Sequence, residues 1–582
     1  MVKDTKNIEM IRHSLAHLLA LMVKGRWSDT KLGMGPAIEN GFYYDFEFQS
    51  HTPSLEDLSK LESDMKSLIK QGIQFEREEI SIEEAKKIFK NEPYKIELIK
   101  ELEQKNDNIS IYKSGDLVDL CQGPHIKSTK EINPEGFHLT KVAGAYWKGD
   151  ENNQMLTRIY GVAFETKKEL DDYLKNIEEA EKRDHRKLGK ELDLFTFSPL
   201  VGSGLPLFTP KGTLLRDLVG EKIYEIQSKF DYKKVWIPHI TKKELYETSG
   251  HWEKYKENLF HVKGKSDTEF VMKPMNCPHH TQIYASTPKS YRDLPVRFVE
   301  ITTNYRDEQP GELLGLSRVR SLTQDDGHIF CAIEHVEKET KNIISVIREF
   351  YTLLGMFGKE DYWVSLSVRD TKSPESYIGD EKNWQEAESI LERVAKDEEL
   401  NYKKIEGEAA FYGPKLDFMF KDSLGREWQL ATIQVDFSMP GRFELKYTDK
   451  DGIIKTPVMI HRAIAGSLER FLSVMIEHFA GAFPLWLSPV QVLIIPVSEK
   501  FNDYGGKILD KLKENNIRVE IDTSNDTLGK RIRSAEIKKT PYVLVVGGKE
   551  EENNTVSVRS REKGDGGAVD TDKFITDFLK TI

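Results

Sequence analysis

Apolar residues recur along this chain at two spacings, one typical of helices and one typical of strands. Residues 8–24 carry one helical stripe of apolar side chains, made up of Ile8, Ile11, Leu15, Leu18, Leu19 and Met22. At about 100° per residue, His13 and His17 fall together on the opposite face. We therefore expect both histidines outside the core, either as plain surface residues or in a cleft.

A loop at residues 119–125 offers partners for these histidines. Its Gly-Pro pair breaks any helix, so Cys121 and His125 are expected on a tight turn. Short strands are predicted at residues 143–147 and 158–163, and a long charged helix at 168–190. We interpret residues 1–170 as one α+β domain and residues 171–190 as a helical linker.

From residue 191 to residue 489, long helices alternate with β-rich segments, which we interpret as a second domain. Helices are predicted at 214–230 and 463–479, and strands at 235–237, 297–303, 318–322, 415–420 and 428–436. The strands predict a mainly antiparallel sheet.

After Pro489, strands and helices alternate in a different way. Strands are predicted at 490–497, 518–521 and 542–546, separated by helices at 501–513 and 528–537. Residues 490–582 are therefore predicted to form a small α/β domain.

Composition narrows the classes of protein that are possible. The chain has 582 residues, which is too long for a single core, and its 38% hydrophobic and 31% charged content excludes a disordered polymer. Three cysteines give no disulfide framework, and no run of about eighteen apolar residues occurs, so we expect a cytoplasmic protein without a membrane partner. A net charge of −11 argues against general nucleic-acid binding, including DNA, and limits any RNA footprint to basic stretches such as 182–187 and 530–539.

Three distant residues, Cys277, His328 and His461, have the composition of a zinc site with three protein ligands. Such a site leaves a fourth position for water or substrate, which is typical of catalytic zinc. A buried free cysteine and two satisfied core histidines are the simpler reading of these residues taken alone. The segments around them decide between the two readings.

Those segments resemble the motifs of class II aminoacyl-tRNA synthetases. Tyr305-Arg306-Asp307-Glu308, Arg318-Val319-Arg320 and Gln324-Asp325-Asp326 are similar to the second motif, and Gly466 to Arg470 is similar to the third. The helix at 214–230 with its following strand and Pro238 is similar to the first motif, which forms the dimer interface in that family. With Cys277, His328 and His461 the resemblance is to threonyl-tRNA synthetases, and it spans roughly Ile8 to Phe578.

The resemblance implies a homodimer that activates L-threonine with ATP and Mg²⁺ and transfers it to the 3′ end of tRNA(Thr). ATP would be held by Arg306, Glu308, Arg318, Lys415, Gln434 and Arg470, with Arg306 and Arg470 also catalytic. Threonine would be oriented by Gln324, Asp326 and Tyr412, and His251 would take a proton during transfer. One Zn²⁺ per chain would bind the amino and hydroxyl groups of threonine and so reject valine.

Serine also carries the hydroxyl, so a second selection step is required. Residues 1–170 resemble the editing domain shared by threonyl- and alanyl-tRNA synthetases, which hydrolyses seryl-tRNA(Thr). The matching residues are His13, His17, Lys95, Asp119, Cys121 and His125. The three histidines and the cysteine of this set could bind zinc, as the corresponding residues of alanyl relatives do. The resemblance to the threonyl family instead implies a hydrolytic cleft without a required metal.

The resemblance also assigns anticodon recognition to residues 490–582. The matching positions are Asn525, Arg533, Lys539, Glu550 and Arg559, with Lys539 standing where an arginine is usual. Three further departures are His279 in place of a glycine, Leu322 in place of an aromatic residue, and an opening without the ubiquitin-like domain of longer members. The expected fold is thus multidomain α+β: an α+β editing domain, an antiparallel-sheet class II core and an α/β anticodon-binding domain.

Two other functions are weighed against this one. A prolyl- or seryl-tRNA synthetase would share the motif arginines but not the set of Cys277, His328 and His461. An inactive RNA-binding regulator of the same fold would have lost a motif arginine or a zinc ligand, and all of these are present.

Overall fold

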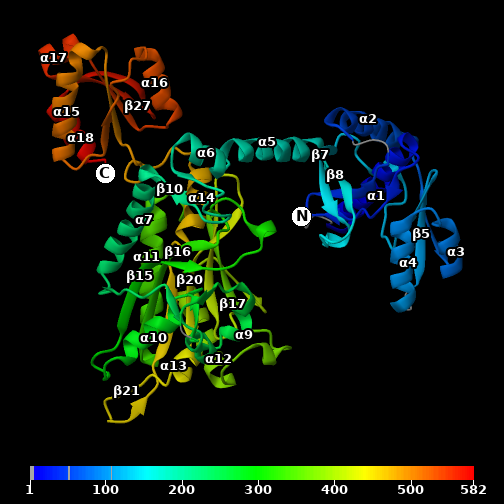
Figure 1. The fold of residues 1–582 in the computed structure, drawn as a ribbon, viewed down its shortest axis with the longest axis horizontal. Coiled ribbons are helices and arrows are strands. Elements are labelled where there is room, and N and C mark those ends of the chain that lie inside the picture. The colour runs from blue at the N-terminus through cyan, green and yellow to red at the C-terminus, as the bar shows by residue number, and fades with distance from the viewer. Residues whose placement is uncertain (1–4, 50–52, 106–107, 266, 582) are drawn as a thin grey trace. The chain divides into compact units, whose positions relative to one another are not determined.

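The computed structural model describes residues 5–49, 53–105, 108–265 and 267–581, which form two compact units, Met1–Glu178 and Glu179–Ile582 (Figure 1). Within the described residues, no helix combines the length and the apolar character that crossing a membrane requires.

The described residues of the first unit form two sheets, the helices α1 to α4 and the beginning of α5 (Lys167–Arg183). Its larger sheet has the order β1-β3-β8-β7, with β2 paired to β3, and its smaller sheet has the order β4-β5-β6. The strands are β1 (Lys31–Leu32), β2 (Ala37–Ile38), β3 (Gly41–Glu47), β4 (Phe75–Ile80), β5 (Ile109–Ser114), β6 (Leu117–Leu120), β7 (Phe137–Tyr146) and β8 (Met155–Ala163). The helices are α1 (Thr5–Arg26), α2 (Leu55–Gln71), α3 (Ile82–Ile88) and α4 (Pro93–Lys105).

Helix α1 is buried on more sides than its apolar stripe predicts. It contacts strands of both sheets, because the small residues Ser14, Ala16 and Ala20 let the second sheet approach the face opposite the stripe. His17 is consequently only 2% exposed, so it is not a plain surface residue. It faces a cleft within the unit, which was the second alternative.

The predicted linker helix is broken in two. Helix α5 (Lys167–Arg183) ends before Asp184, whose side chain accepts a hydrogen bond from the backbone N–H of Arg186 and so begins α6 (His185–Glu191). The guanidinium of Arg183 donates to the carbonyls of Glu477 and His478, and Arg186 pairs with Asp184. Two cations of the basic stretch 182–187 are thus engaged within the protein.

The core of the second unit is an eight-stranded sheet in the order β11-β15-β16-β23-β20-β19-β17-β18. Only the outermost pairs, β11 with β15 and β17 with β18, are parallel, so the prediction of a mainly antiparallel sheet is confirmed. The strands are β11 (Lys233–Lys234), β15 (Val296–Tyr305), β16 (Ser321–Cys331), β17 (Tyr362–Val368), β18 (Tyr402–Glu406), β19 (Lys415–Lys421), β20 (Glu427–Asp436) and β23 (Val458–Ala463). The helices packed with them include α7 (Pro210–Ser228), α8 (Glu244–Ser249), α10 (Cys277–Ala285), α11 (Val336–Leu353), α12 (Glu381–Asp397) and α14 (Leu468–His478).

Several predicted boundaries in this domain are wrong, including those of the first helix, which runs from Pro210 to Ser228 rather than from 214 to 230. The strand near residues 235–237 is formed by Lys233–Lys234 instead, and Trp236 beyond it is 75% exposed. Strand β16 begins at Ser321 rather than at residue 318. Helix α14 begins at Leu468 rather than at residue 463, because residues up to Ala463 pair in β23 and Ser467 caps the helix.

The last domain has a five-stranded sheet in the order β25-β24-β26-β27-β28. Its strands are β24 (Val492–Pro496), β25 (Val519–Ile521), β26 (Tyr542–Val546), β27 (Thr555–Ser560) and β28 (Gly564–Asp570), and its helices are α15 (Asn502–Glu514), α16 (Leu528–Ile537), α17 (Gly548–Asn553) and α18 (Thr571–Leu579). Helices α15 and α18 pack on one face of the sheet and α16 on the other (Figure 1). The α/β prediction is confirmed, with β27, β28, α17 and α18 added.

Candidate active sites

The structure brings Cys277, His328 and His461 together at the centre of the large sheet. His328 on β16 and His461 on β23 are direct register partners, and Cys277 is the first residue of α10, which packs beside β16. One ligand atom from each lies within 4.8 Å of the other two, and His328 Nε2 is 3.1 Å from His461 Nδ1. All three side chains are buried.

The second nitrogen of each histidine has its own partner. His461 Nε2 lies 3.0 Å from Asp436 Oδ2, and His328 Nδ1 lies 2.7 Å from His280 Nδ1. Each ring therefore points one nitrogen into the cluster while the other is held outside it, as is usual for metal-binding histidines. Burial raises the pKa of the Cys277 thiol and lowers the pKa of His328, so both side chains favour their neutral forms. A bound metal cation would stabilise the thiolate form of Cys277.

A buried ion pair, which the sequence analysis missed, joins the strands of this site. Arg462 NH1 donates to Asp325 Oδ1 at 2.7 Å, and its NH2 donates to Gln227 Oε1 at 2.7 Å. The other oxygen of Asp325 accepts the backbone N–H groups of Ile464 and Ala465. An arginine next to His461 in the largely apolar run 458–465 was the available signal, because a buried cation requires a partner.

Three arginines of the predicted ATP site converge near the second and third motifs. The pKa of Arg470 is lowered, first by partial burial and then by the positive charges of Arg306 and Arg318. Arg470 Nε donates to the carbonyl of Ser317, and Arg318 forms an ion pair with Glu308 at 2.7 Å. A cluster of arginines of this kind is suited to an anion such as a polyphosphate.

The remaining predicted residues of this site are distributed around the same sheet. Lys415 and Gln434 are register partners on β19 and β20, and Gln434 is adjacent to His461 on β23. Asp326 accepts a hydrogen bond from Asn276, the residue before Cys277, at 2.8 Å. Gln324 on β16 accepts from the side chain of Asn304.

His251 is buried rather than on the surface. Its ring centroid lies 5.9 Å from that of Tyr412, which is itself 5.3 Å from the ring of His461. Burial lowers the pKa of His251 to about 3, with the positive potential of nearby groups adding to the effect. His251 is therefore a neutral imidazole beside the candidate metal site, and a pKa this low disfavours proton transfer to it in the unliganded protein.

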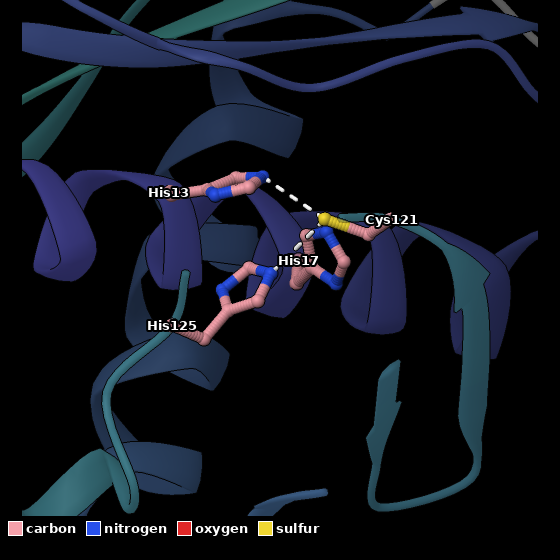
Figure 2. A group of neighbouring side chains, drawn as sticks. All are labelled: His13, His17, Cys121 and His125. Atoms are coloured by element: carbon pink, nitrogen blue, oxygen red, sulfur yellow. Dashed lines mark hydrogen bonds between the residues drawn. The ribbon is translucent and has the colours of Figure 1, made fainter. Parts of the chain in front are cut away.

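The second site lies in the first unit, at α1 and the loop after β6. Cys121 Sγ is 3.3 Å from His13 Nε2 and 3.3 Å from His125 Nε2, and Figure 2 shows these side chains and His17 gathered around the sulfur. The four residues offer ligand atoms within 4.8 Å of one another. The spacing of His13 and His17 on one helix is thus what aligns them with the loop.

A buried polar triad adjoins this cleft. Asp119 forms an ion pair with Lys95, accepts a hydrogen bond from Tyr44 Oη at 2.6 Å and lies 3.7 Å from His17 Nε2. Lys95 and Asp119 are only 2% and 1% exposed. Tyr44, which the sequence analysis missed, is one residue among several aromatics of β3, and nothing in its local pattern marks it.

Burial keeps the cleft uncharged apart from the Lys95–Asp119 pair. It lowers the pKa values of His13, His17 and His125, with the neighbouring histidines adding to the effect at the last two. Burial also raises the pKa of Cys121 to about 11. Without a metal, the cleft therefore holds a thiol and neutral imidazoles at neutral pH.

The five predicted anticodon positions lie on different parts of the last domain. Asn525 and Arg533 are exposed, Lys539 and Arg559 line one cavity beside β26 and β27, and Glu550 accepts the backbone N–H of Gly547 at the start of α17. Arg559 also pairs with Asp565 at 3.4 Å, and Glu550 serves as a helix cap. His279, the departure next to Cys277, is buried with neither ring nitrogen hydrogen-bonded in the described chain.

Three family models match the chain. They are the tRNA synthetase class II core domain (G, H, P, S and T) at residues 260–479, the anticodon binding domain at 491–581, and the threonyl and alanyl tRNA synthetase second additional domain at 109–160.

Similar proteins extend this match over almost the full length. The threonine–tRNA ligases of Gloeobacter violaceus and Thermus thermophilus are 49% and 48% identical, covering 97% and 99% of this chain and 90% and 89% of theirs. A solved structure, the RNA binding domain of threonyl-tRNA synthetase from Cryptosporidium parvum, is 35% identical with a TM-score of 0.64, and the match covers 68% of this chain and 98% of that one. Because identity near one half extends through both sites described above, the chain belongs to the threonine–tRNA ligases, class II aminoacyl-tRNA synthetases with an editing-type domain.

Proposed function

We propose that threonine is activated beside a single Zn²⁺ held by Cys277, His328 and His461. The observation that carries this proposal is the convergence of the three ligand atoms within 4.8 Å, from one helix and two paired strands. The donor set suits zinc, since one sulfur and two imidazole nitrogens leave the fourth tetrahedral position open. Bound there, zinc would act as a Lewis acid toward both the amino group and the hydroxyl group of threonine. Valine lacks the hydroxyl group and would therefore make only one of these two contacts.

The protein's own groups would position the substrates. The carboxylate of Asp326, held by Asn276 at 2.8 Å, is suited to accept a hydrogen bond from the amino group of threonine. Gln324 and Tyr412 would complete the pocket for the side chain. His251 would take a proton during transfer to the tRNA, for which the bound substrates must raise its pKa from about 3.

ATP would bind with Mg²⁺ at the converging arginines. Arg306, Arg318 and Arg470 would neutralise the phosphates, while Lys415 and Gln434 would hold the adenylate. Glu308 pairs with Arg318 in this structure, so binding of the adenine amino group to Glu308 would require that pair to rearrange.

Pyrophosphate exchange across a panel of amino acids tests this assignment. Exchange that depends on threonine, with much weaker exchange for valine, is expected. Exchange that depends on proline alone or on serine alone would show that the chain activates a different amino acid. No exchange with any amino acid would favour an inactive RNA-binding regulator.

We propose that the first unit hydrolyses seryl-tRNA(Thr) in the cleft of His13, His17, Cys121 and His125. A histidine there would position the attacking water, and Nδ1 of the buried His17 has no hydrogen-bond partner among the described residues. Lys95 and Asp119 would hold the polar end of the cleft. We assign the reaction to these groups without a required metal, although the same four donors would also accept zinc.

Residues 490–582 are proposed to read the anticodon, with Asn525, Arg533, Lys539 and Arg559 as the exposed or cavity-lining contacts and Glu550 in a supporting place. Deleting this domain should abolish charging of tRNA(Thr) while threonine-dependent pyrophosphate exchange continues. Unchanged tRNA affinity after the deletion would refute the assignment.

A homodimer is proposed through the first motif. Trp236 is 75% exposed and Ile301 is 42% exposed, and both border one hollow on α7 and β15. An exposed tryptophan next to further apolar surface is typical of a subunit interface.

The three free cysteines support a reducing compartment such as the cytoplasm.

A further inference from the structure

The second unit contains another cluster of titratable groups, formed by Asp184, His185 and Glu477, outside both sites described above. His185 is the first residue of α6, Glu477 lies at the end of α14, and both side chains are almost fully enclosed. The cluster resembles a metal site in composition, but its donor atoms are already occupied. Glu477 Oε1 accepts from His185 and Oε2 accepts from Arg426.

The hydrogen bonds of His185 determine its tautomer. Its Nδ1 lies 2.6 Å from Glu477 Oε1, while its Nε2 lies 3.0 Å from the backbone nitrogen of Leu316. A backbone N–H can only donate, so Nε2 must carry the lone pair and Nδ1 must carry the proton. The carboxylate of Glu477 suits this arrangement, since its hydrogen bonds from His185 and Arg426 leave its pKa below the ordinary value despite burial.

Leu316 lies in the segment between β15 and β16 that carries Glu308 and Arg318. The next residue, Ser317, accepts Arg470 Nε on its carbonyl at 3.1 Å and contacts Ser473 on α14 through its hydroxyl at 2.9 Å. Leu316 is completely buried. The bond from its N–H to His185 therefore fixes the backbone from which Arg318 extends and on which Arg470 rests.

Close packing shows that the contact is specific. Gly315 has a φ of +49°, and a Cβ placed on it would lie 2.2 Å from His185 Nε2. Any side chain at position 315 would overlap the imidazole of His185, so only glycine fits there. The approach is made by backbone, which cannot move aside as a flexible side chain can.

We propose that His185 is a positioning residue for ATP: through Leu316 it sets the segment that presents Arg318 and Arg470 to the phosphates. It touches neither substrate in this scheme. The inference rests on the assignment of Arg318 and Arg470 to ATP given above. It adds to that assignment a residue of α6, the second half of the predicted linker, which no motif of the catalytic core includes.

Two substitutions separate the two hydrogen bonds. His185→Asn keeps a donor near the Nδ1 position, and so the bond to Glu477, but leaves the buried N–H of Leu316 without an acceptor. His185→Gln places an amide oxygen near the Nε2 position and so retains an acceptor for Leu316. Arg426→Gln is the matched control, because it loosens Glu477 through its other oxygen without touching Leu316.

The assay is ATP-dependent pyrophosphate exchange by the full-length protein, with thermal unfolding of every variant. His185→Asn should raise KM for ATP about 5- to 10-fold, as expected for a buried donor left unpaired, with KM for threonine unchanged. His185→Gln should return KM for ATP to within about two-fold of the unmodified protein. Arg426→Gln should lower the unfolding temperature without changing KM for ATP.

Equal KM values for ATP in His185→Asn and His185→Gln would overturn the proposal, as would parallel changes in KM for ATP and for threonine, which indicate general loosening. The underlying ATP assignment is tested separately with Arg470→Ala. If that variant left KM for ATP unchanged, the assignment of Arg470 would fail whatever the His185 variants showed.

Discussion

Replacing His13 and His17 together with alanine should separate the editing reaction from the synthetic reaction. Both side chains project from α1 into the cleft around Cys121, within the unit Met1–Glu178. All the residues of the candidate synthetic site belong to the other unit. The double variant should therefore charge threonine normally and accumulate seryl-tRNA when serine is supplied.

The structure sets the expected loss of stability. His17 is 2% exposed and makes no close hydrogen bond in the described chain, so its removal leaves mainly a cavity, which costs about 1–3 kcal/mol. His13 loses contacts to Cys121 Sγ and to the carbonyl of Pro124, which is worth about 1 kcal/mol. The rings are 5.3 Å apart, so the two losses need not add. A total of about 2–4 kcal/mol is smaller than the usual stability of a domain.

This cost should depend on pH. Burial lowers the pKa of His17 well below its ordinary value of 6.5, so the unfolded chain binds a proton below pH 6.5 that the folded chain excludes. The contribution of neutral His17 to the free energy of unfolding is therefore fully present above pH 6.5. As the pH falls below 6.5, the free energy of unfolding decreases by up to about 1.4 kcal/mol per pH unit. The alanine variant lacks this loss, so the stability difference should shrink between pH 7 and pH 5.

Deacylation of preformed seryl-tRNA is the assay, with threonine-dependent pyrophosphate exchange measured in parallel. His138→Ala is the matched control, because His138 lies in the same unit outside the cleft and pairs with Glu62 at 2.7 Å. Hydrolysis at the unmodified rate by the double variant would refute the editing assignment. Equal loss of hydrolysis in His138→Ala would show that unit stability, rather than the cleft, was being measured.

Three further predictions concern single residues. Alkylation of Cys121 in the folded protein should be slow at pH 8 and rise toward pH 11, because burial raises its pKa to about 11; rapid reaction at pH 7 would contradict the uncharged cleft. Arg462→Met should lower the free energy of unfolding by about 3–5 kcal/mol in a denaturant titration, because Asp325 would remain buried without its partner; a loss below about 1 kcal/mol would refute this. Trp236→Asp should yield folded monomers in sedimentation velocity, and an unchanged oligomer would exclude Trp236 from the interface.

Local patterns were sufficient to predict elements that depend on local interactions. Helix α16 was predicted at 528–537 and is found there, and β26 was predicted at 542–546 and is found there. Helix α14 was placed too early because apolar residues continue from β23 into it, and only the cap at Ser467 marks the change. The apolar segment at 235–237 leaves Trp236 exposed, a position that hydrophobic composition alone does not predict.

Long-range contacts explain what was missed in the sites. The sequence indicated Cys277, His328 and His461, but their partner Asp436 follows only from strand pairing, and their partner His280 follows only from the packing of α10 on β16. The apolar stripe of α1 did not reveal the second sheet that buries His17, because that approach depends on small residues on the other face. Contacts of this kind join segments that no local pattern relates.

Elemental analysis of the purified protein and of Cys277→Ser and Cys121→Ser is the most direct test of the central claim that zinc occupies the synthetic site. One zinc per chain is expected in the unmodified protein and in Cys121→Ser, with a marked loss in Cys277→Ser. Retention of zinc by Cys277→Ser together with its loss from Cys121→Ser would place the metal in the editing cleft and contradict the account of threonine selection.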